Sequence, residues 1–448
     1  MSQVLADPVA RRREQRGWYV YDWANSTFST TVVSVFLGPY LTDVAKKAAD
    51  ADGFVHVLGI PVRATAWFTA AVFVSVALQV LVLPVVGALA DRTRSKRAML
   101  AGWAYLGATA TVLLVLVQND EFLLGGVLFV VANLSLGASV VVYNAFLPEI
   151  AEPDERDGVS SRGWALGYLG GALLLTANLA LYGARHSLGW SDSLAVRVCL
   201  VSAGVWWAAF TVVPLLALHD RPPRHVVAAG GVGPVRAGFT QLASTLRDLR
   251  GFRHSWMFLI AFLLYNDGIQ AAISFSATYG SQELELSQET LASAILLVQF
   301  VGFGAGLGLG RLARRTGAKR TVLGTLVVWT VVVAVAAVLP AGEPLLFYLL
   351  AVVIGIVLGG SQALSRSLFS QLIPAGREAE YFGLYEISDS ATSAIGALLI
   401  FVTIQVTGSY RLAIVALVVF FAVGFALLSR VDVAAGARAV GNEVPSVV

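Results

Sequence analysis

The sequence predicts an all-α integral membrane protein with twelve transmembrane helices in two similar six-helix halves. The composition is the first observation, because 57% hydrophobic and 13% charged residues with a mean hydropathy of +0.74 lie outside the range of soluble proteins. The second is a series of twelve apolar runs, each about 20 residues long, the length a helix needs to cross a bilayer. The third is an eleven-residue motif that returns 223 positions later with seven residues identical.

The twelve predicted spans follow one another with mostly short connections. Their apolar residues lack the strict alternation of a membrane β-strand, which favours helices. The spans cover residues 17–41, 65–90, 98–117, 122–147, 162–183, 195–218, 255–280, 288–312, 320–339, 344–371, 380–406 and 410–430.

The internal repeat is visible at three places along the chain. In each half a basic motif lies between the second and third spans, so it forms a short loop joining two helices. Two further pairs match at nearly the same offset. The matching segments are Gly87–Arg97 with Gly310–Arg320, Leu147–Pro148 with Ile373–Pro374, and Gly171–Leu174 with Gly396–Leu399. The chain is therefore expected to be two copies of one unit, an organisation typical of proteins that move small solutes.

The long connection 219–254 divides the chain into its halves, because its proline and glycine clusters have the composition of a linker. We expect a first half over 1–218, a cytoplasmic linker, a second half over 255–430 and a cytoplasmic tail over 431–448. Within the linker, apolar residues of 239–250 recur at helical spacing. That stretch could lie on the membrane surface or form a solvated helix leading into the seventh span.

Basic residues predict the orientation of the spans, since loops rich in Lys and Arg remain in the cytoplasm. With both termini inside, the cytoplasmic segments hold 24 of the 31 basic residues, the other side holds six, and Arg366 lies within the tenth span. We therefore expect a multi-pass cell-membrane protein with cytoplasmic termini. The net charge of +3 reflects this topology and gives no reason to expect a nucleic-acid partner.

The first basic loop resembles the loop motif of the major facilitator superfamily, whose two six-helix repeats the chain matches over nearly its whole length. In that motif a glycine permits close helix approach, an aspartate anchors a helix end, and basic residues pair across the cytoplasmic gate. The resemblance implies the major facilitator fold and assigns these gating roles to Gly87, Asp91, Arg92 and Lys96. A simpler alternative is that the charges only fix the topology.

The second copy departs from this pattern. It carries Arg314 in place of the aspartate, followed by Arg315, and both are candidate gating residues. The first copy in turn has Arg94 where the motif usually has glycine, a position that Gly317 keeps in the second. The latch is therefore better supported in the first half.

Two polar motifs inside the membrane resemble a narrower family, the vacuole-effluxer-like transporters. They are Tyr21–Ser26 in the first span and Tyr265–Gly268 in the seventh. Fungal members are implicated in releasing amino acids from the vacuole after autophagy. The resemblance therefore implies a small-molecule substrate, with amino acids as its class.

The same motifs place carboxylates inside the bilayer, where they are costly and normally face a cavity or a partner. Asp267 lies about eleven residues into its helix, roughly 16 Å deep, and has Tyr265 and Asn266 beside it. Asp22 lies nearer the cytoplasmic side, with Asn25 on the same face. Either aspartate could carry a coupling proton or meet a substrate ammonium group. Asp22 could instead pair with an interfacial base such as Arg16.

An arginine and two further acids lie at similar depth in the tenth and eleventh spans. Arg366 with Glu386 or Asp389 would form an ion pair that clamps the structure or gates its inner side. Alternatively, Arg366 binds a substrate carboxylate and complements an ammonium group at Asp267.

No motif indicates an enzyme, a cofactor or a metal site. The chain lacks a Walker A sequence, an HExxH motif and paired Cys or His ligands, and Cys199 is its single cysteine. We expect a monomeric secondary transporter that moves amino acids by alternating access, with protons as possible coupling ions. Export of sugars, drugs or peptides, movement of lipids, and a non-transporting nutrient sensor remain the alternatives.

Overall fold

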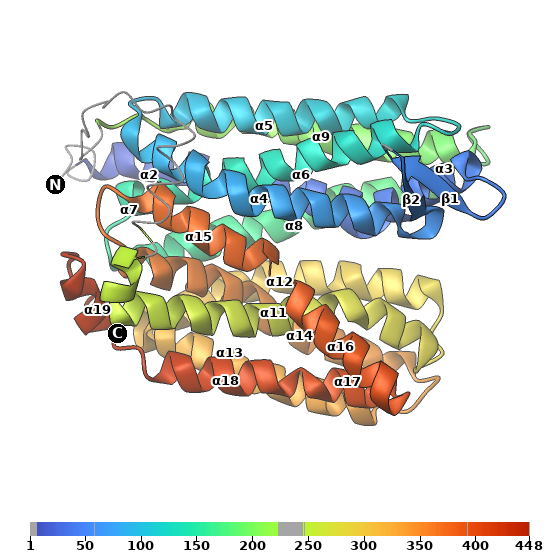
Figure 1. The fold of residues 1–448 in the computed structure, drawn as a ribbon. Helices are drawn as coiled ribbons and strands as arrows, with labels where there is room; N and C mark the ends of the chain where they lie inside the picture. Colours follow the sequence, from blue (N-terminus) through green and yellow to red (C-terminus); the bar gives the residue numbers. More distant parts are fainter. Residues whose placement is uncertain (1–6, 58, 223–244, 246, 392, 448) are drawn as a thin grey trace.

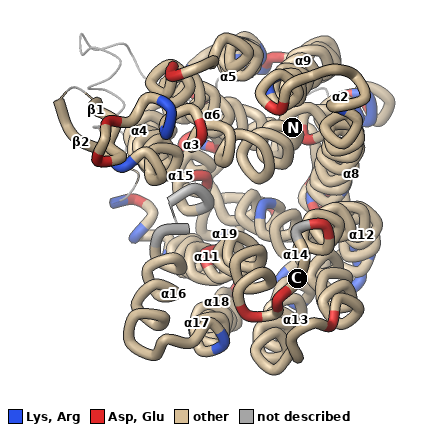
Figure 2. The backbone as a smooth tube through the Cα atoms, turned by 90° about the vertical axis from the view of Figure 1, so that its right-hand side faces the viewer, with Lys and Arg blue, Asp and Glu red and all other residues tan. Residues whose placement is uncertain are grey.

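The computed structural model describes residues 7–57, 59–222, 245, 247–391 and 393–447. The chain forms a bundle of long helices in two groups, with the first half above the second in Figure 1. Figure 2 looks along the bundle and shows most of the backbone tan, with Lys, Arg, Asp and Glu at scattered places. The predicted fold class, twelve transmembrane helices in two six-helix halves, is confirmed.

The first half contains the helices of spans one to six and one short β-hairpin. Its elements are α2 (Pro8–Thr27), η1 (Phe28–Phe36), α3 (Leu37–Ala48), β1 (Phe54–Val57), β2 (Ile60–Arg63), η2 (Ala64–Ala66), α4 (Trp67–Arg92), α5 (Lys96–Leu113), η3 (Leu114–Leu116), α6 (Phe122–Ala145), α7 (Leu147–Ile150), α8 (Arg156–Gly183) and α9 (Asp192–Ala217).

The second half contains spans seven to twelve and a short helix near the C-terminus. Its elements are α11 (Arg253–Gln282), α12 (Gln288–Thr316), α13 (Ala318–Val338), α14 (Pro344–Gln371), α15 (Glu378–Ala391), α16 (Ser393–Thr407), α17 (Tyr410–Ala416), α18 (Val418–Ser429) and α19 (Val433–Ala439).

The first span differs in form from the uninterrupted helix that the sequence predicts, because it continues from α2 through the π-helix η1 into α3. The eleventh span is described by α15 and α16 on either side of residue 392, which lies outside the described residues. The remaining spans give ten helices that, among the described residues, are each long and apolar enough to cross a bilayer. The strands β1 and β2 pair antiparallel after α3 and were not predicted. Most of the stretch 239–250 lies outside the described residues.

Each half has its own hydrophobic core. The buried apolar side chains fall into two clusters that follow the two halves, except that Ala379 of the second half joins the first cluster and Tyr168 of the first half joins the second. Both exceptions mark places where the halves touch.

We call the end of the bundle where α2 begins and α18 ends the termini end, and the opposite end, where β1 and β2 lie, the hairpin end (Figure 1).

Candidate functional site

The two halves meet along a seam in which α8 packs against α12 and α14, and α4 packs against α15. The repeated motif supplies a glycine to two of these contacts, α4 with α15 and α8 with α12. A Cβ on Gly87 would lie 2.3 Å from the carbonyl oxygen of Ala379, and a Cβ on Gly310 would lie 2.5 Å from the Cβ of Ser161. Both distances are far below van der Waals contact, so only glycine permits this approach. Equivalent residues of the two copies thus close the termini end on both sides.

Glycines of α8 bring the first helix equally close. A Cβ on Gly163 would lie 2.5 Å from a carboxylate oxygen of Asp22, and one on Gly167 would lie 2.6 Å from the hydroxyl of Ser26. The glycine spacing in α8 therefore serves helix packing, as its four-residue period predicts. It also presses the polar motif of α2 against the seam.

Arg366 is the centre of the polar contacts in the seam. It extends from α14 into the first half, and its side chain is only 3% exposed. Its Nε donates to the hydroxyl of Ser160 at 2.8 Å, and its two terminal nitrogens donate to the Asp22 carboxylate at 3.0 and 3.4 Å. The same nitrogens donate to the Ser160 carbonyl at 3.0 Å and to Oδ1 of Asn144 at 3.3 Å. All five guanidinium N–H groups therefore have an acceptor.

Aromatic rings enclose this guanidinium group. Its carbon lies 4.7 Å from the ring centre of Trp18, 5.6 Å from that of Tyr143 and 5.5 Å from that of Trp164. Trp18 and Tyr143 stack with centroids 4.3 Å apart. A cation held against several ring faces gains electrostatic stabilisation in a place that water cannot reach. The pair of Arg366 with Asp22 is consequently a desolvated bond between the halves.

The sequence predicts an ion pair of Arg366 with Glu386 or Asp389 of the eleventh span. Among the described residues the ion pair of Arg366 is instead with Asp22, 344 residues away, so the pairing with Glu386 is not what the structure shows. Depth in the membrane does not tell which helix faces which, and the seam brings Arg366 of α14 against α8 and α2. Glu386 is half-buried, while the side chain of Asp389 lies outside the described residues.

Asp267 occupies a different setting, near the middle of α11. It is fully buried, and no described residue donates a hydrogen bond to either carboxylate oxygen in good geometry. The backbone of Gly396 in α16 lies beside it, since a Cβ there would be 3.3 Å from Oδ1 of Asp267. A carboxylate so placed lacks the partner that buried charges normally have.

The other predicted binding residues lie near one or the other of these aspartates. Tyr265 is buried in α11, and its hydroxyl lies 2.5 Å from that of Ser365, which precedes Arg366. Asn266 is also fully buried. Asn25 is buried one turn beyond Asp22 on α2, and its amide nitrogen has no hydrogen-bond partner among the described residues. The predicted residues thus form two groups, one around Arg366 in the seam and one around Asp267 in the second half.

The first copy of the basic motif forms a latch across the seam. The Asp91 carboxylate accepts the backbone N–H groups of Ala379 at 3.0 Å and Glu380 at 2.9 Å, so it caps the first turn of α15 in the opposite half. Lys96 lies 3.5 Å from Asp91 and donates to Glu149 at 2.7 Å. This geometry matches the anchoring role that the motif implies for the aspartate. Arg92, by contrast, is half-buried at the end of α4.

The second copy has a different environment. Arg314 and Arg315 are both exposed at the end of α12. Neither caps a helix, because a guanidinium group donates hydrogen bonds and cannot accept them from backbone N–H groups. Lys319 instead donates to the carbonyl of Ser429 within its own half, at 2.9 Å. The first copy of the motif therefore forms a latch between the halves, whereas the second copy forms a basic cluster that caps no helix.

Sequence reasoning missed three of the residues that surround Arg366, which are Trp18, Ser160 and Trp164. Trp18 and Asp22 are one turn apart on α2, as are Ser160 and Trp164 on α8, so each pair shares a helix face. That spacing was the only sequence signal that the residues of each pair lie together. It does not indicate that they surround Arg366, which lies about 200 or more residues further along the chain.

Solved structures with this arrangement belong to the major facilitator superfamily. FucP in the outward conformation superposes with a TM-score of 0.69 at 14% identity, over 94% of this chain and 98% of FucP. A bacterial homologue of the iron transporter ferroportin in an outward-facing state gives a TM-score of 0.64 at 12% identity, over 94% and 98% of the two chains. At these identities the likeness establishes the fold alone, which is the major facilitator fold.

The class of protein, a membrane transporter of this superfamily, is given by the sequence comparisons rather than by the fold. A family model described as vacuole effluxer Atg22 like matches residues 10–441. The chain belongs to this family, as the motifs of the first and seventh spans predict. It is 28% identical to the uncharacterized MFS-type transporter YxiO of Bacillus subtilis, over 94% of this chain and 95% of YxiO. It is 26% identical to Autophagy-related protein 22 of Pyricularia oryzae, over 97% of this chain and 78% of that protein.

Proposed function

We propose that the protein is a proton-coupled secondary transporter that moves amino acids across the cell membrane by alternating access. The observation that carries this proposal is the ion pair between Asp22 and Arg366, which joins the two halves at 3.0 Å inside the membrane. Its two charges have the signs that an amino acid's ammonium and carboxylate groups would require. When the halves separate, each charge loses its partner and becomes available to a substrate.

The orientation follows from the loop charges. The termini end carries the basic loops, so we place it in the cytoplasm. The hydrogen bonds between the halves gather at this end, including those from Arg156 to the Ser370 carbonyl at 2.7 Å and from Ser160 to the Ala363 carbonyl at 2.6 Å. The proposed conformation is therefore closed to the cytoplasm, as the likeness to outward-facing transporters also suggests.

In this conformation Arg366 acts as a clamp. Its five N–H groups are all in use, so a substrate carboxylate can reach it only after the seam opens. Both roles that the sequence leaves open for Arg366 then belong to one cycle, clamp in the closed state and substrate ligand in the open state. The energy that holds the seam closed is also the energy that a bound substrate must replace.

Asp267 is the proposed proton carrier. No ion pair within the described residues includes its carboxyl group, and neither carboxylate oxygen has a hydrogen bond of good geometry there to hold a negative charge. We propose that it takes up a proton in the outward-facing state and releases it when the second half rearranges. In this proposal, protonation of Asp267 in the second half is coupled to the opening of the ion pair between Asp22 and Arg366, which joins the two halves.

The test is uptake of a mixed pool of labelled amino acids into vesicles that contain the purified protein, with and without an imposed pH gradient. We expect accumulation that follows the gradient, and we expect Asp267→Asn to lose accumulation while it still exchanges substrate across the membrane. Asp43→Asn is the matched control, because Asp43 is an exposed carboxylate on α3. An absence of flux in both conditions would overturn the substrate assignment, and gradient-driven uptake by Asp267→Asn would overturn the coupling role.

A further inference from the structure

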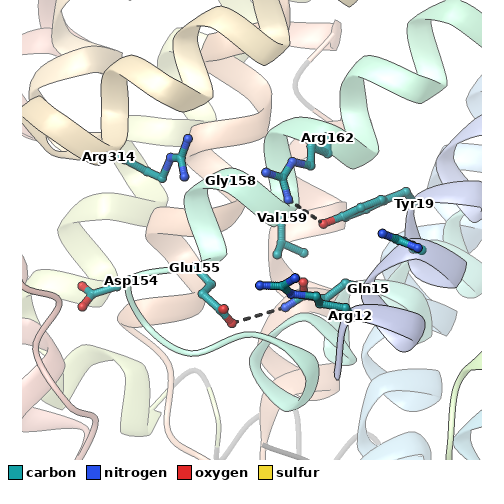
Figure 3. Close-up of a pocket in the computed structure, with 10 residues that line it drawn as sticks. Arg12, Gln15, Tyr19, Asp154, Glu155, Gly158, Val159, Arg162 and Arg314 are labelled. Atoms are coloured by element: carbon teal, nitrogen blue, oxygen red, sulfur yellow. Dashed lines mark hydrogen bonds between the residues drawn. The ribbon is translucent and has the colours of Figure 1, made fainter. Parts of the chain in front are cut away.

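A basic cavity lies at the termini end where the two halves meet. It measures about 600 Å³ and lies among α2, α8 and α12. Figure 3 shows Arg12 and Tyr19 on α2, Arg162 on α8 and Arg314 on α12 around this space. Arg16 of α2 also lines it. The cavity thus contains four arginines contributed by three helices from both halves.

The arginines are not neutralised by the acids nearby. Two acids, Asp154 and Glu155, also line the cavity. Glu155 lies 3.4 Å from Arg11, which does not line the cavity, and Asp154 accepts the backbone N–H of Ser446 at 2.6 Å. None of the ion pairs formed within the described residues includes any of the four arginines that line the cavity. The cavity therefore has an excess of positive charge, which favours an anion.

A buried hydroxyl provides independent evidence for a ligand. Ser161 is 1% exposed, and its Oγ has no hydrogen-bond partner among the described residues. It lines a smaller recess that shares Arg162 and Arg314 with the basic cavity and adds Arg311. A buried hydroxyl without a partner is unfavourable. A free hydroxyl donor among guanidinium groups suits a phosphate, whose oxygens accept several charge-assisted hydrogen bonds.

We propose that this cavity binds a phosphate-bearing anion that holds the two halves together at the termini end. A volume of about 600 Å³ is within the range of small-ligand sites and exceeds the needs of phosphate alone. The anion is an organic phosphate, either the headgroup of an anionic phospholipid or a soluble phosphate ester. Because Arg162 and Arg314 belong to opposite halves, a ligand that contacts both favours the closed conformation over the open one. This proposal does not depend on the identity of the transported substrate.

The experiment measures the melting temperature of the full chain in lipid nanodiscs. One series adds sodium glycerol 3-phosphate to phosphatidylcholine nanodiscs, with sodium chloride at equal ionic strength as the reference. The other compares phosphatidylcholine with mixed phosphatidylglycerol nanodiscs without added phosphate. The test variant is Arg162→Gln with Arg314→Gln. The control is Arg94→Gln with Arg430→Gln, which removes the same charge from two exposed arginines outside the cavity.

Stabilisation of the parent by glycerol 3-phosphate would support a soluble ligand, and stabilisation by phosphatidylglycerol alone would support a lipid headgroup. In either case we expect the test variant to bind at least tenfold more weakly and the control to behave as the parent. Ser161→Ala, which removes only the hydroxyl group, should weaken binding several-fold if the test variant does not fold. Equal responses of test and control variants, or no stabilisation beyond sodium chloride, would overturn the proposal.

Discussion

Replacement of Asp22 by asparagine should open the seam at the termini end. The substitution keeps the shape of the side chain but removes the only charge paired with Arg366 among the described residues, whose guanidinium group is 3% exposed. Removal of one partner from a buried ion pair typically costs about 3–5 kcal/mol. The pair joins the two halves, so this penalty falls on the closed conformation. Since about 1.4 kcal/mol corresponds to a factor of ten, the closed population should fall roughly a hundredfold or more relative to the open one.

Electron-electron distances between two spin labels measure this change. Exposed positions Arg94 and Arg430 lie at the termini end, one in each half, and can carry the labels in a background without Cys199. We expect Asp22→Asn to shift the distribution from short to long distances. Asp43→Asn is the control, because its pair with Lys46 is exposed at 3.8 Å and such surface pairs contribute about 0–1 kcal/mol. A distribution that stays the same in Asp22→Asn would refute the role of the pair in closing the seam.

Three further predictions concern the same end of the bundle. Gly87→Ala should disfavour closure and reduce transport strongly, since the new Cβ would lie 2.3 Å from the Ala379 carbonyl oxygen, whereas Gly102→Ala, with no heavy atom within 4 Å, should transport normally. Asp91→Ala should lower stability by about 0.5–2 kcal/mol, because α15 loses its capping acceptor, and thermal unfolding would show it. The side-chain amide of Asn442 donates to the carbonyls of Ile373 and Gln371 at 2.8 and 2.9 Å. Asn442→Ala should therefore loosen the C-terminal segment and increase hydrogen exchange there.

The sequence was sufficient to predict the helices and the halves, because their signals are local. Span length, hydropathy and the repeat of Gly87 at Gly310 each depend on residues close together in the chain. The close contacts of both glycines also follow from the motif. The β-hairpin and the π-helix of the first span were missed, since short β-strands and a change of helix type alter the hydropathy pattern little.

The partners within the site depended on packing between the halves, which no local pattern specifies. Asp22 and Arg366 were both singled out as buried charges, yet they were assigned to different partners. Their contact requires α14 to lie against α8 and α2, and that arrangement is set by the glycines of α8 and by side-chain volume along the whole seam. Insertion energetics identify which side chains need a partner, while the three-dimensional packing decides which partner each one gets.

The face of α12 that meets α8 differs from an ordinary helix interface, because its glycines present no side chains to the neighbouring helix. A Cβ on Gly302 or Gly306 would lie only at ordinary contact distance, 3.4 Å, from Tyr168 or Ala165 of α8, so the helices interlock less here than at Gly310. Where side chains of two helices interdigitate, they must separate before the helices can turn against each other. Around Gly302 and Gly306 the contact has fewer such obstacles than at Gly310, where α8 and α12 approach most closely. We therefore expect the halves to turn against each other most easily along this part of the seam, with the charges around Arg366 favouring the closed position.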